Sequence, residues 1–365
     1  FAVTSDATQL SIAVSPKGSA TVFKKGVPFK IVVTARDANG NVANVTSAKP
    51  IKIKKVSASS DGTLAGDDDT ADGTILLGNS SVTIDGDAGT TAVSFNKADS
   101  ALVISASGLG TVNSSPILVA GDPSKFVVTT ITPSSPTAGS PFKVKVEMRD
   151  SSGNSTYGEK TATLGRTAGN GALSAPQGAF TEAGAQTSVN IEGVTYTVAE
   201  PGVKLKATGP SMSFTESSPF TVVAGAVAKL KVASINGGAI VTATTGFSVT
   251  VQVLDLNNNV AKAAANIAVT LTKAAAGTGS STLGGTMTGT IAANSSSVTI
   301  SGVTLSAAGK GLVITASAEN ITSDDSDTFN VAGSATALLV VSVAAISPAT
   351  SIVAGQPFAV TVKAV

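Results

Sequence analysis

One segment of the chain, PFKVKVEMRDSSGN, sets a pattern that recurs along the sequence. From Phe142 to Arg149 apolar residues alternate with charged ones. This period of two predicts a half-buried antiparallel strand with one face in a core. Asp150 follows, and the Asp-Ser-Ser-Gly-Asn sequence is typical of a tight turn, because Asp bonds downstream backbone and Gly accepts a positive φ. The segment therefore predicts a strand that ends in a hairpin-type turn.

Three further copies of this segment begin at Phe29, Phe247 and Phe358. In the first two an aspartate lies eight residues after the Phe, at Asp37 and Asp255, and the fourth copy ends before that position. The spacings between successive phenylalanines are 113, 105 and 111 residues. Each repeat is long enough for a core of its own. We therefore expect several domains, and we expect this sequence to stop inside the last of them.

Further repeated segments predict about seven strands in each domain. Ser-Val-x-Ile-x-Gly occurs in all three complete repeats, and each also has an opening strand, a middle strand and a closing strand that ends in Ala-Gly. About seven short strands in about 105 residues is typical of an immunoglobulin-like sandwich. The fold class predicted is all-β, with tandem immunoglobulin-like β-sandwich domains of about seven antiparallel strands each, arranged end to end. Cys and Trp are absent, so the cores must consist of aliphatic residues and the repeated Phe.

The Ala-Gly segments also predict the domain limits. Phe1–Thr4 resembles the three later closing strands, and opening strands follow each closing strand after nine or ten residues. We predict that residues 1–6 close a preceding domain, that residues 7–121, 122–225 and 226–333 form three domains, and that residues 334–365 open a further one. The linkers around Ala-Gly are too short for a flexible coil.

Composition excludes several functions. The chain has 24 basic and 23 acidic residues, so it lacks the basic surface that nucleic acids require. It has no His and no Cys, which rules out Ser-His-Asp and Cys-His catalysis, His-based zinc sites and disulfides. The most apolar run, 337–346, is about half of the roughly 20 residues that a membrane helix needs. We expect no enzyme, no nucleic-acid partner and no membrane-spanning segment in this range.

One acidic loop is a candidate Ca²⁺ site. Asp67, Asp68, Asp69 and Asp72 place hard oxygen ligands between glycines, which suits calcium, although the spacing differs from an EF-hand and a polar loop is the alternative. Weaker candidates are Asp85 and Asp87, and separately Asp324, Asp325 and Asp327. We interpret the turn residues Asp37, Asp150 and Asp255 as backbone caps. No catalytic or cofactor-binding residues are predicted.

Glycan attachment is more plausible than glycan recognition. The chain has no Trp and two Tyr, so it offers few aromatic faces for sugar rings. Six N-x-Ser/Thr sequons are candidates for glycosylation: Asn44, Asn79, Asn113, Asn154, Asn294 and Asn320.

The ordered motifs A-G-x-P-F-x-V-x-V, D-x-x-G-N, S-V-T-I-x-G, L-V-I-T-A and V-A-G cover essentially the whole chain. Together they resemble the tandem bacterial immunoglobulin-like (Big/invasin-type) repeats of surface-layer proteins, adhesins and other extracellular surface proteins. The third repeat departs from the pattern, because Gly246 stands in place of Pro before Phe247, and Asn258 replaces the turn glycine. The resemblance implies a secreted, cell-surface protein.

We therefore expect a structural segment of a long extracellular cell-surface protein, foremost a surface-layer or surface-filament component that self-associates into a lattice or filament. The alternatives are the stalk of a bacterial adhesin that presents a distal binding domain, and a non-catalytic spacer of an extracellular enzyme. A further alternative is strand exchange, in which residues 1–4 of one copy complete the strands 338–365 of another.

Overall fold

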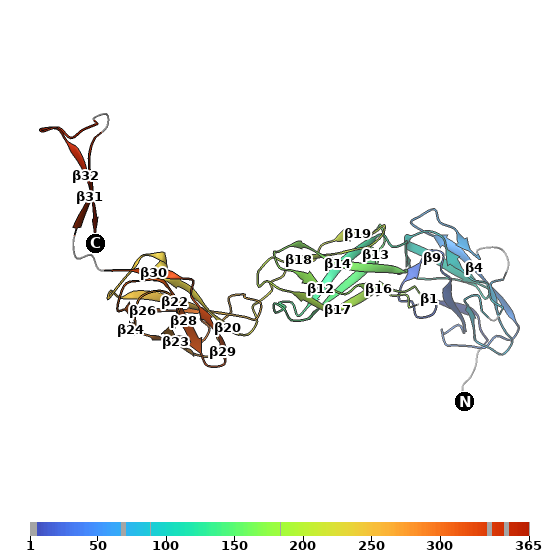
Figure 1. Cartoon of the computed structure of the whole chain (residues 1–365). Helices are drawn as coiled ribbons and strands as arrows, with labels where there is room; N and C mark the ends of the chain where they lie inside the picture. The colour runs from blue at the N-terminus through green and yellow to red at the C-terminus, as the bar shows by residue number, and fades with distance from the viewer. Residues whose placement is uncertain are drawn as a thin grey trace. The chain divides into compact units, whose positions relative to one another are not determined.

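The structure is a computed structural model that describes residues 6–364 apart from 67–70, 88, 183, 334–337 and 347–349. Contacts between Cα atoms divide it into two compact units. The first unit holds residues 1–136, 141–196 and 200–222, and the second holds 137–140, 197–199 and 223–365. Both units consist of β-strands, mostly antiparallel, that form β-sandwiches, so the predicted all-β, immunoglobulin-like class is confirmed (Figure 1).

The first sandwich packs a three-stranded sheet on a larger one. The small sheet has the order β1 (Gln9–Pro16), β3 (Phe29–Arg36), β7 (Ser81–Ile84). The larger has the order β2 (Phe23–Lys24), β11 (Ile117–Ala120), β9 (Asp99–Ser107), β4 (Lys49–Ser57), β6 (Gly73–Ile75), with β10 (Thr111–Asn113) beside β9. A short pair, β5 (Leu64–Ala65) and β8 (Ser94–Phe95), closes one side. One hydrophobic core of aliphatic side chains and the rings of Phe29 and Phe95 fills the space between the sheets.

The second sandwich completes the first unit. One sheet has the order β15 (Leu173–Ser174), β17 (Ser188–Tyr196), β13 (Phe142–Arg149), β12 (Lys125–Thr132), β19 (Ser213–Thr215). The other has the order β16 (Gly178–Phe180), β14 (Lys160–Ala168), β18 (Lys204–Thr208). Along β13 every second residue from Phe142 is buried, which confirms the predicted core face of the repeated strand.

The second unit contains the third sandwich. Its large sheet has the order β24 (Leu283–Gly285), β26 (Ser297–Leu305), β22 (Phe247–Leu254), β20 (Lys229–Ile235), β29 (Ile321–Asp325), β28 (Ile314–Ala318), β23 (Ile267–Lys273), β25 (Thr288–Ile291). Its small sheet has the order β21 (Val241–Thr242), β30 (Phe329–Ala332), β27 (Gly309–Leu312). The 3₁₀ turn Asn236–Gly238 precedes β21. The domain limits drawn from the sequence stay a prediction.

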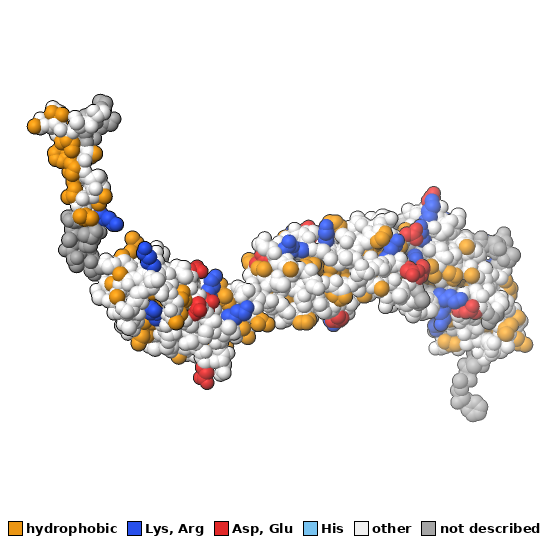
Figure 2. Space-filling model, viewed as in Figure 1, with side chains coloured by type: hydrophobic (Ala, Val, Ile, Leu, Met, Phe, Trp, Pro, Cys, Tyr) orange, Lys and Arg blue, Asp and Glu red, His pale blue; other side chains and the backbone are white. Residues whose placement is uncertain are grey.

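The last strands, β31 (Leu338–Ala345) and β32 (Phe358–Ala364), form a two-stranded sheet. The register shifts between Val340 and Ser342, as it does at the equivalent place in β12 and in β20. Phe358 is 48% exposed, whereas the equivalent Phe142 is 4% exposed. Figure 2 shows apolar side chains along this hairpin. Its strand register therefore matches that of the second and third sandwiches, but its apolar residues are not buried. No helix among the described residues is long and apolar enough to cross a membrane.

Candidate functional site

The best-defined polar site lies where the first sandwich leads into the second. Asp150, 1% exposed, ends β13, and its Oδ1 accepts hydrogen bonds from the backbone N–H of Ser152 (3.0 Å) and Asn154 (2.9 Å). Its Oδ2 accepts from Gly121 N–H (2.7 Å) and from the Asn154 side chain (3.3 Å). Gly121 belongs to the linker between β11 and β12. One carboxylate therefore caps its own turn and also holds the linker that precedes its sandwich.

The carbonyl of the same linker glycine is also held. The hydroxyl of Thr156, a residue with no exposed surface, donates to Gly121 O at 2.6 Å. Thr156 is fixed in turn by a backbone bond from its N–H to Met148 O. Since both polar backbone groups of Gly121 bond to the second sandwich, the linker is fixed at this point, as buried backbone groups generally require.

A lysine of the first sandwich reaches across this junction. Lys24 of β2 is 8% exposed, and its Nζ lies 2.7 Å from Glu182 Oε1 and 4.8 Å from the ring centroid of Tyr157. Burial, together with the negative charge of Glu182, raises the pKa of Tyr157, so the ring stays neutral beneath the ammonium group. At the rim, Lys25 Nζ lies 2.6 Å from Asp122.

The second unit contains the same carboxylate arrangement. Asp255 Oδ1 accepts from the N–H groups of Asn257 (2.8 Å) and Asn259 (2.9 Å), and its Oδ2 accepts from Gly225 N–H (2.9 Å) and the Asn259 side chain (2.9 Å). Burial opposes ionisation of Asp255, but the bonds from the Asn259 side chain, Gly225 and the turn N–H groups outweigh it and lower the pKa. The group is therefore an acceptor-only carboxylate at neutral pH.

Side-chain amides surround Asp255 within the second unit. Asn257 Nδ2 donates to Ala138 O (3.2 Å), and Asn259 Nδ2 donates to Thr197 O (3.0 Å). Ala199 N–H donates to Asn259 Oδ1 (2.9 Å). The loops 137–140 and 197–199 thus belong to this unit through hydrogen bonds to uncharged groups.

Asp37 repeats the turn in the first sandwich. Its Oδ1 accepts from the N–H groups of Asn39 and Asn41, both at 2.9 Å, and its Oδ2 accepts from the Asn41 side chain at 3.2 Å. The capping role predicted for these aspartates is confirmed. The second role of Asp150 and Asp255, at the linker, was not predicted from the sequence. A signal for it was present, since an Ala-Gly pair precedes both aspartates at nearly the same separation.

The candidate calcium loop falls mostly outside the described residues. Asp67, Asp68 and Asp69 lie in the part that the structure does not describe. Asp72 is 1% exposed, and its Oδ2 accepts from Ile53 N–H of β4 at 2.6 Å, so it already anchors the core sheet. Among the described residues no three acidic groups could hold a metal ion. The calcium site stays a prediction, which a calcium titration followed by thermal unfolding tests.

The weaker acidic candidates each have bonds of their own. Asp87 donates its N–H to Asp85 Oδ1 (3.1 Å) and pairs with Lys17 (3.2 Å). Asp324 Oδ2 accepts from Val232 N–H (2.8 Å), and Asp325 accepts from the Thr315 hydroxyl (2.5 Å). Asp327, the last of these candidates, lines the same open surface of the third sandwich as Asp324 and Asp325. Among the described residues, Asp324, Asp325 and Asp327 do not form a group that could hold a metal ion, and the pair Asp85 and Asp87 stays a prediction.

A buried tyrosine in the second sandwich also forms a polar network. Tyr196, which has no exposed surface, donates its hydroxyl to Glu200 Oε1 at 2.5 Å and accepts from Gly171 N–H at 2.8 Å. The bond from Tyr196, together with bonds from Asn170 and Gly171, lowers the pKa of Glu200. Burial, followed by the bond to Glu200, raises the pKa of Tyr196. The pair closes the loop at residues 169–171 and is satisfied internally.

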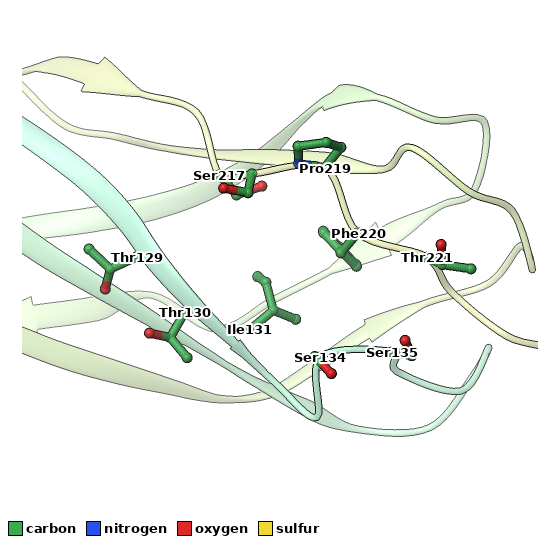
Figure 3. A pocket seen from close by; sticks show the side chains of 10 residues that line it. Thr129, Thr130, Ile131, Ser134, Ser135, Ser217, Pro219, Phe220 and Thr221 are labelled. Carbon is green, nitrogen blue, oxygen red and sulfur yellow. The ribbon is translucent and has the colours of Figure 1, made fainter.

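One groove lies in the second sandwich (Figure 3). It has a volume of about 430 Å³ between Thr129–Ile131 of β12 and the segment Ser217–Thr221. The first sandwich has a matching groove of about 490 Å³, between Ile12–Val14 and Ser114–Leu118. Hydroxyl, proline, aliphatic and phenylalanine side chains line both grooves, and none of them titrates near neutral pH. Neither groove therefore offers an acid, a base or a strong nucleophile.

Neither a protein-family model nor a curated protein matches the chain. Among solved structures, the chain is similar to FdeC, an adhesin of Escherichia coli, with 19% identity over 90% of this chain and 98% of that chain, and a TM-score of 0.36. It is similar to invasin, a bacterial integrin-binding protein, with 13% identity over 92% of this chain and 62% of that chain, and a TM-score of 0.33. It is also similar to domains 5–6 of the S-layer protein SbsC, with 18% identity over 58% of this chain and 100% of that chain, and a TM-score of 0.22.

These proteins include both classes that the sequence resemblance names, adhesins and surface-layer proteins. With TM-scores below 0.5 and identities below 25%, the similarities carry no argument about function. Function must therefore be argued from the chain's own sites.

Proposed function

We propose that the chain is a non-catalytic structural segment of an extracellular cell-surface protein, and that it serves as a component of a surface layer or surface filament. The observation that supports this is the carboxylate that holds a linker glycine at both described junctions, Asp150 to Gly121 and Asp255 to Gly225. A sandwich whose entry linker is fixed by hydrogen bonds to a buried carboxylate keeps a set linker conformation at its entry. A role in spacing or lattice building needs this property, whereas a flexible tether does not.

The chemistry of the junction also supports a permanent structural role. Asp150 accepts four N–H hydrogen bonds and Asp255 accepts five, with at least two at each carboxylate oxygen. Such a carboxylate has its acceptor sites occupied. The junctions thus hold their geometry with the chain's own donors, and they do not depend on a ligand.

Electron microscopy of the native cell surface, with antibodies against this chain as the label, tests the proposal. We expect label over an ordered array or along filaments. Label confined to the base of separate projections would instead favour the adhesin stalk. Label that coincides with an extracellular enzyme would favour the spacer. Absence of label from the cell surface would overturn the proposal.

A further inference from the structure

One loop of the second sandwich contains a dipeptide that is chemically reactive in unfolded chains. The dipeptide is Asn170–Gly171, in the connection between β14 and β15. In an Asn-Gly sequence the backbone nitrogen of the glycine can attack the side-chain amide carbon of the asparagine, because glycine has no side chain to hinder the approach. Asn170 is exposed to solvent, so exposure alone would favour this reaction.

The reaction is a deamidation, and its only co-reactant is water. A bond forms between the Gly171 nitrogen and Asn170 Cγ, the Cγ–Nδ2 bond breaks, and the N–H proton leaves with the amide nitrogen as ammonia. Water then opens the five-membered imide at one of its two carbonyl carbons, which gives aspartate or isoaspartate at position 170. The attacking nitrogen has to approach Cγ closely, so the rate depends on how freely the two groups can move.

The structure holds both reacting groups by hydrogen bonds to the same carboxylate. Gly171 is buried, and its N–H donates to the Tyr196 hydroxyl (2.8 Å) and to Glu200 Oε1 (3.1 Å). The side-chain amide of Asn170 donates to Glu200 Oε2 (2.9 Å), and its backbone N–H donates to Glu200 Oε1 (2.5 Å). Glu200 therefore binds the nucleophilic N–H and also the amide that this nitrogen attacks.

The rest of the sandwich keeps this arrangement in place. Arg166 of β14 donates Nη1–H to Gly171 O at 2.7 Å, so both polar backbone groups of Gly171 are bonded. The Tyr196 hydroxyl donates to Glu200 Oε1 at 2.5 Å. A Cβ at Gly169, where φ is +107°, would overlap the Tyr196 hydroxyl, so the loop fits closely around it. Gly171 N can reach the asparagine side chain only after these bonds break.

We propose that Asn170–Gly171 is a latent deamidation site, and that Glu200 and Tyr196 keep it unreacted in the folded second sandwich. This inference goes beyond the proposed structural function and does not depend on it. An aspartate at position 170 would place a second carboxylate beside Glu200, at the place where Asn170 Nδ2 now lies 2.9 Å from Oε2. Two like charges at this separation repel each other. The product therefore cannot rebuild the same bonds, and each deamidation leaves a permanent record that the loop has opened.

Peptide mapping by mass spectrometry measures the reaction at each asparagine while the whole chain is incubated in mildly alkaline buffer. In the urea-unfolded chain, Asn170 should react about as fast as Asn39 and Asn236, which are also followed by glycine. In the folded chain, Asn170 should react at least about tenfold more slowly than in urea, which corresponds to about 1.4 kcal/mol in activation free energy.

Two variants remove the protecting groups. Glu200→Ala removes the shared acceptor and should speed the reaction of Asn170 in the folded chain by about tenfold. Tyr196→Phe keeps the ring but removes one of the two acceptors of the Gly171 N–H, so it should speed the reaction by a smaller factor. Glu192→Ala is the matched control, because it removes a carboxylate that is 63% exposed in the same sandwich, and it should leave the rate unchanged.

Asp150→Ala separates these bonds from overall stability, because it destabilises the same sandwich and leaves the Glu200 bonds in place. Circular dichroism checks that each variant is folded, and Tyr196→Phe decides the matter if Glu200→Ala does not fold. An equal rate at Asn170 in Asp150→Ala and in Glu200→Ala would overturn the inference, since folding alone would then protect the site. A folded wild type that reacts as fast as the unfolded chain would also overturn it. So would a slower Glu200→Ala variant, because Glu200 would then act as a general base.

Discussion

The two described junctions share a carboxylate with the same turn and linker hydrogen bonds, and they differ in the other side chains near it. At Gly121, Asp150 is accompanied by the Lys24–Glu182 ion pair and the Tyr157 ring. At Gly225, Asp255 is accompanied by Asn257 and Asn259, whose side-chain amides donate to the backbone carbonyls of Ala138 and Thr197. The aspartate, which is common to both junctions, fixes the linker. The side chains near it differ, and they determine whether the junction contains an ion pair. The hydrogen-bonded aspartate should therefore dominate stability, and the neighbours should set how each junction responds to salt.

The largest effect is expected from removing the carboxylate. Asp150→Ala and Asp255→Ala should each destabilise the sandwich that contains them by about 3 kcal/mol, because several buried N–H groups lose a charged acceptor. Urea unfolding measures this loss. Asp122→Ala, which removes a carboxylate that is 66% exposed, is the control and should cost little. Equal losses for Asp122 and Asp150 would show that the linker bond is unimportant.

A smaller effect is expected from pH. The pKa of Asp255 is lowered on folding, so this group stabilises the native state above the ordinary carboxyl pKa. That contribution is lost as the pH falls through the lowered native pKa. Urea unfolding at pH about 6 and about 3 should therefore show a smaller acid-induced loss for Asp255→Asn than for the wild type, as linkage requires. Parallel losses would mean that the native and unfolded pKa values do not differ.

Salt should distinguish the two junctions. Lys24→Met keeps the aliphatic stem but removes the charge, and it should cost less than about 1 kcal/mol because Glu182 is largely exposed. Added salt should reduce that difference between variant and wild type, since it screens the pair. Thr137→Val, the equivalent substitution at the tip of the second sandwich, should show no salt dependence. Unfolding in low and high salt measures both, and a salt-dependent Thr137→Val would contradict the comparison.

The smallest effect is expected at the rim. The Lys25–Asp122 pair is short at 2.6 Å, but its side chains are 36% and 66% exposed. Lys25→Ala should change the free energy of unfolding by about 0.3 kcal/mol or less, because solvent screens exposed pairs. A loss of unfolding free energy as large as that for Lys24→Met would show that the exposed Lys25–Asp122 pair contributes as much to stability as the Lys24–Glu182 pair.

The sequence predicted the strands because their signal is local. The alternation from Phe142 to Arg149 reports directly which side chains are buried, and the structure buries Phe142 and Met148 as expected. The hairpin β31–β32 shows the limit of this signal. Phe358 has the same local pattern, yet it is 48% exposed, because burial depends on strands far away in the sequence. A repeat can thus predict register without predicting what covers it.

The junction could be predicted only in part for the same reason. The turn role of Asp150 involves Ser152 and Asn154, which are near neighbours. Its bond to Gly121 spans 29 residues, and the Lys24–Glu182 pair spans 158, so no local pattern contains them. The acidic run at Asp67–Asp69 was a candidate site because consecutive aspartates are visible in the sequence itself. The buried Asp99 was not predicted as a structural residue, although its oxygens accept hydrogen bonds from the N–H groups of Ser59, Ser60 and Ala101.

The placement of the linker carboxylate also bears on how such a chain can change in length. Asp150 and Asp255 each bond the linker before their own sandwich, so each of these two repeats carries the group that orders its own entry. Duplication or loss of one whole repeat therefore leaves every remaining linker beside an intact aspartate. Genetic recombination between repeats can lengthen or shorten the protein in steps of one sandwich, and no new joint has to evolve.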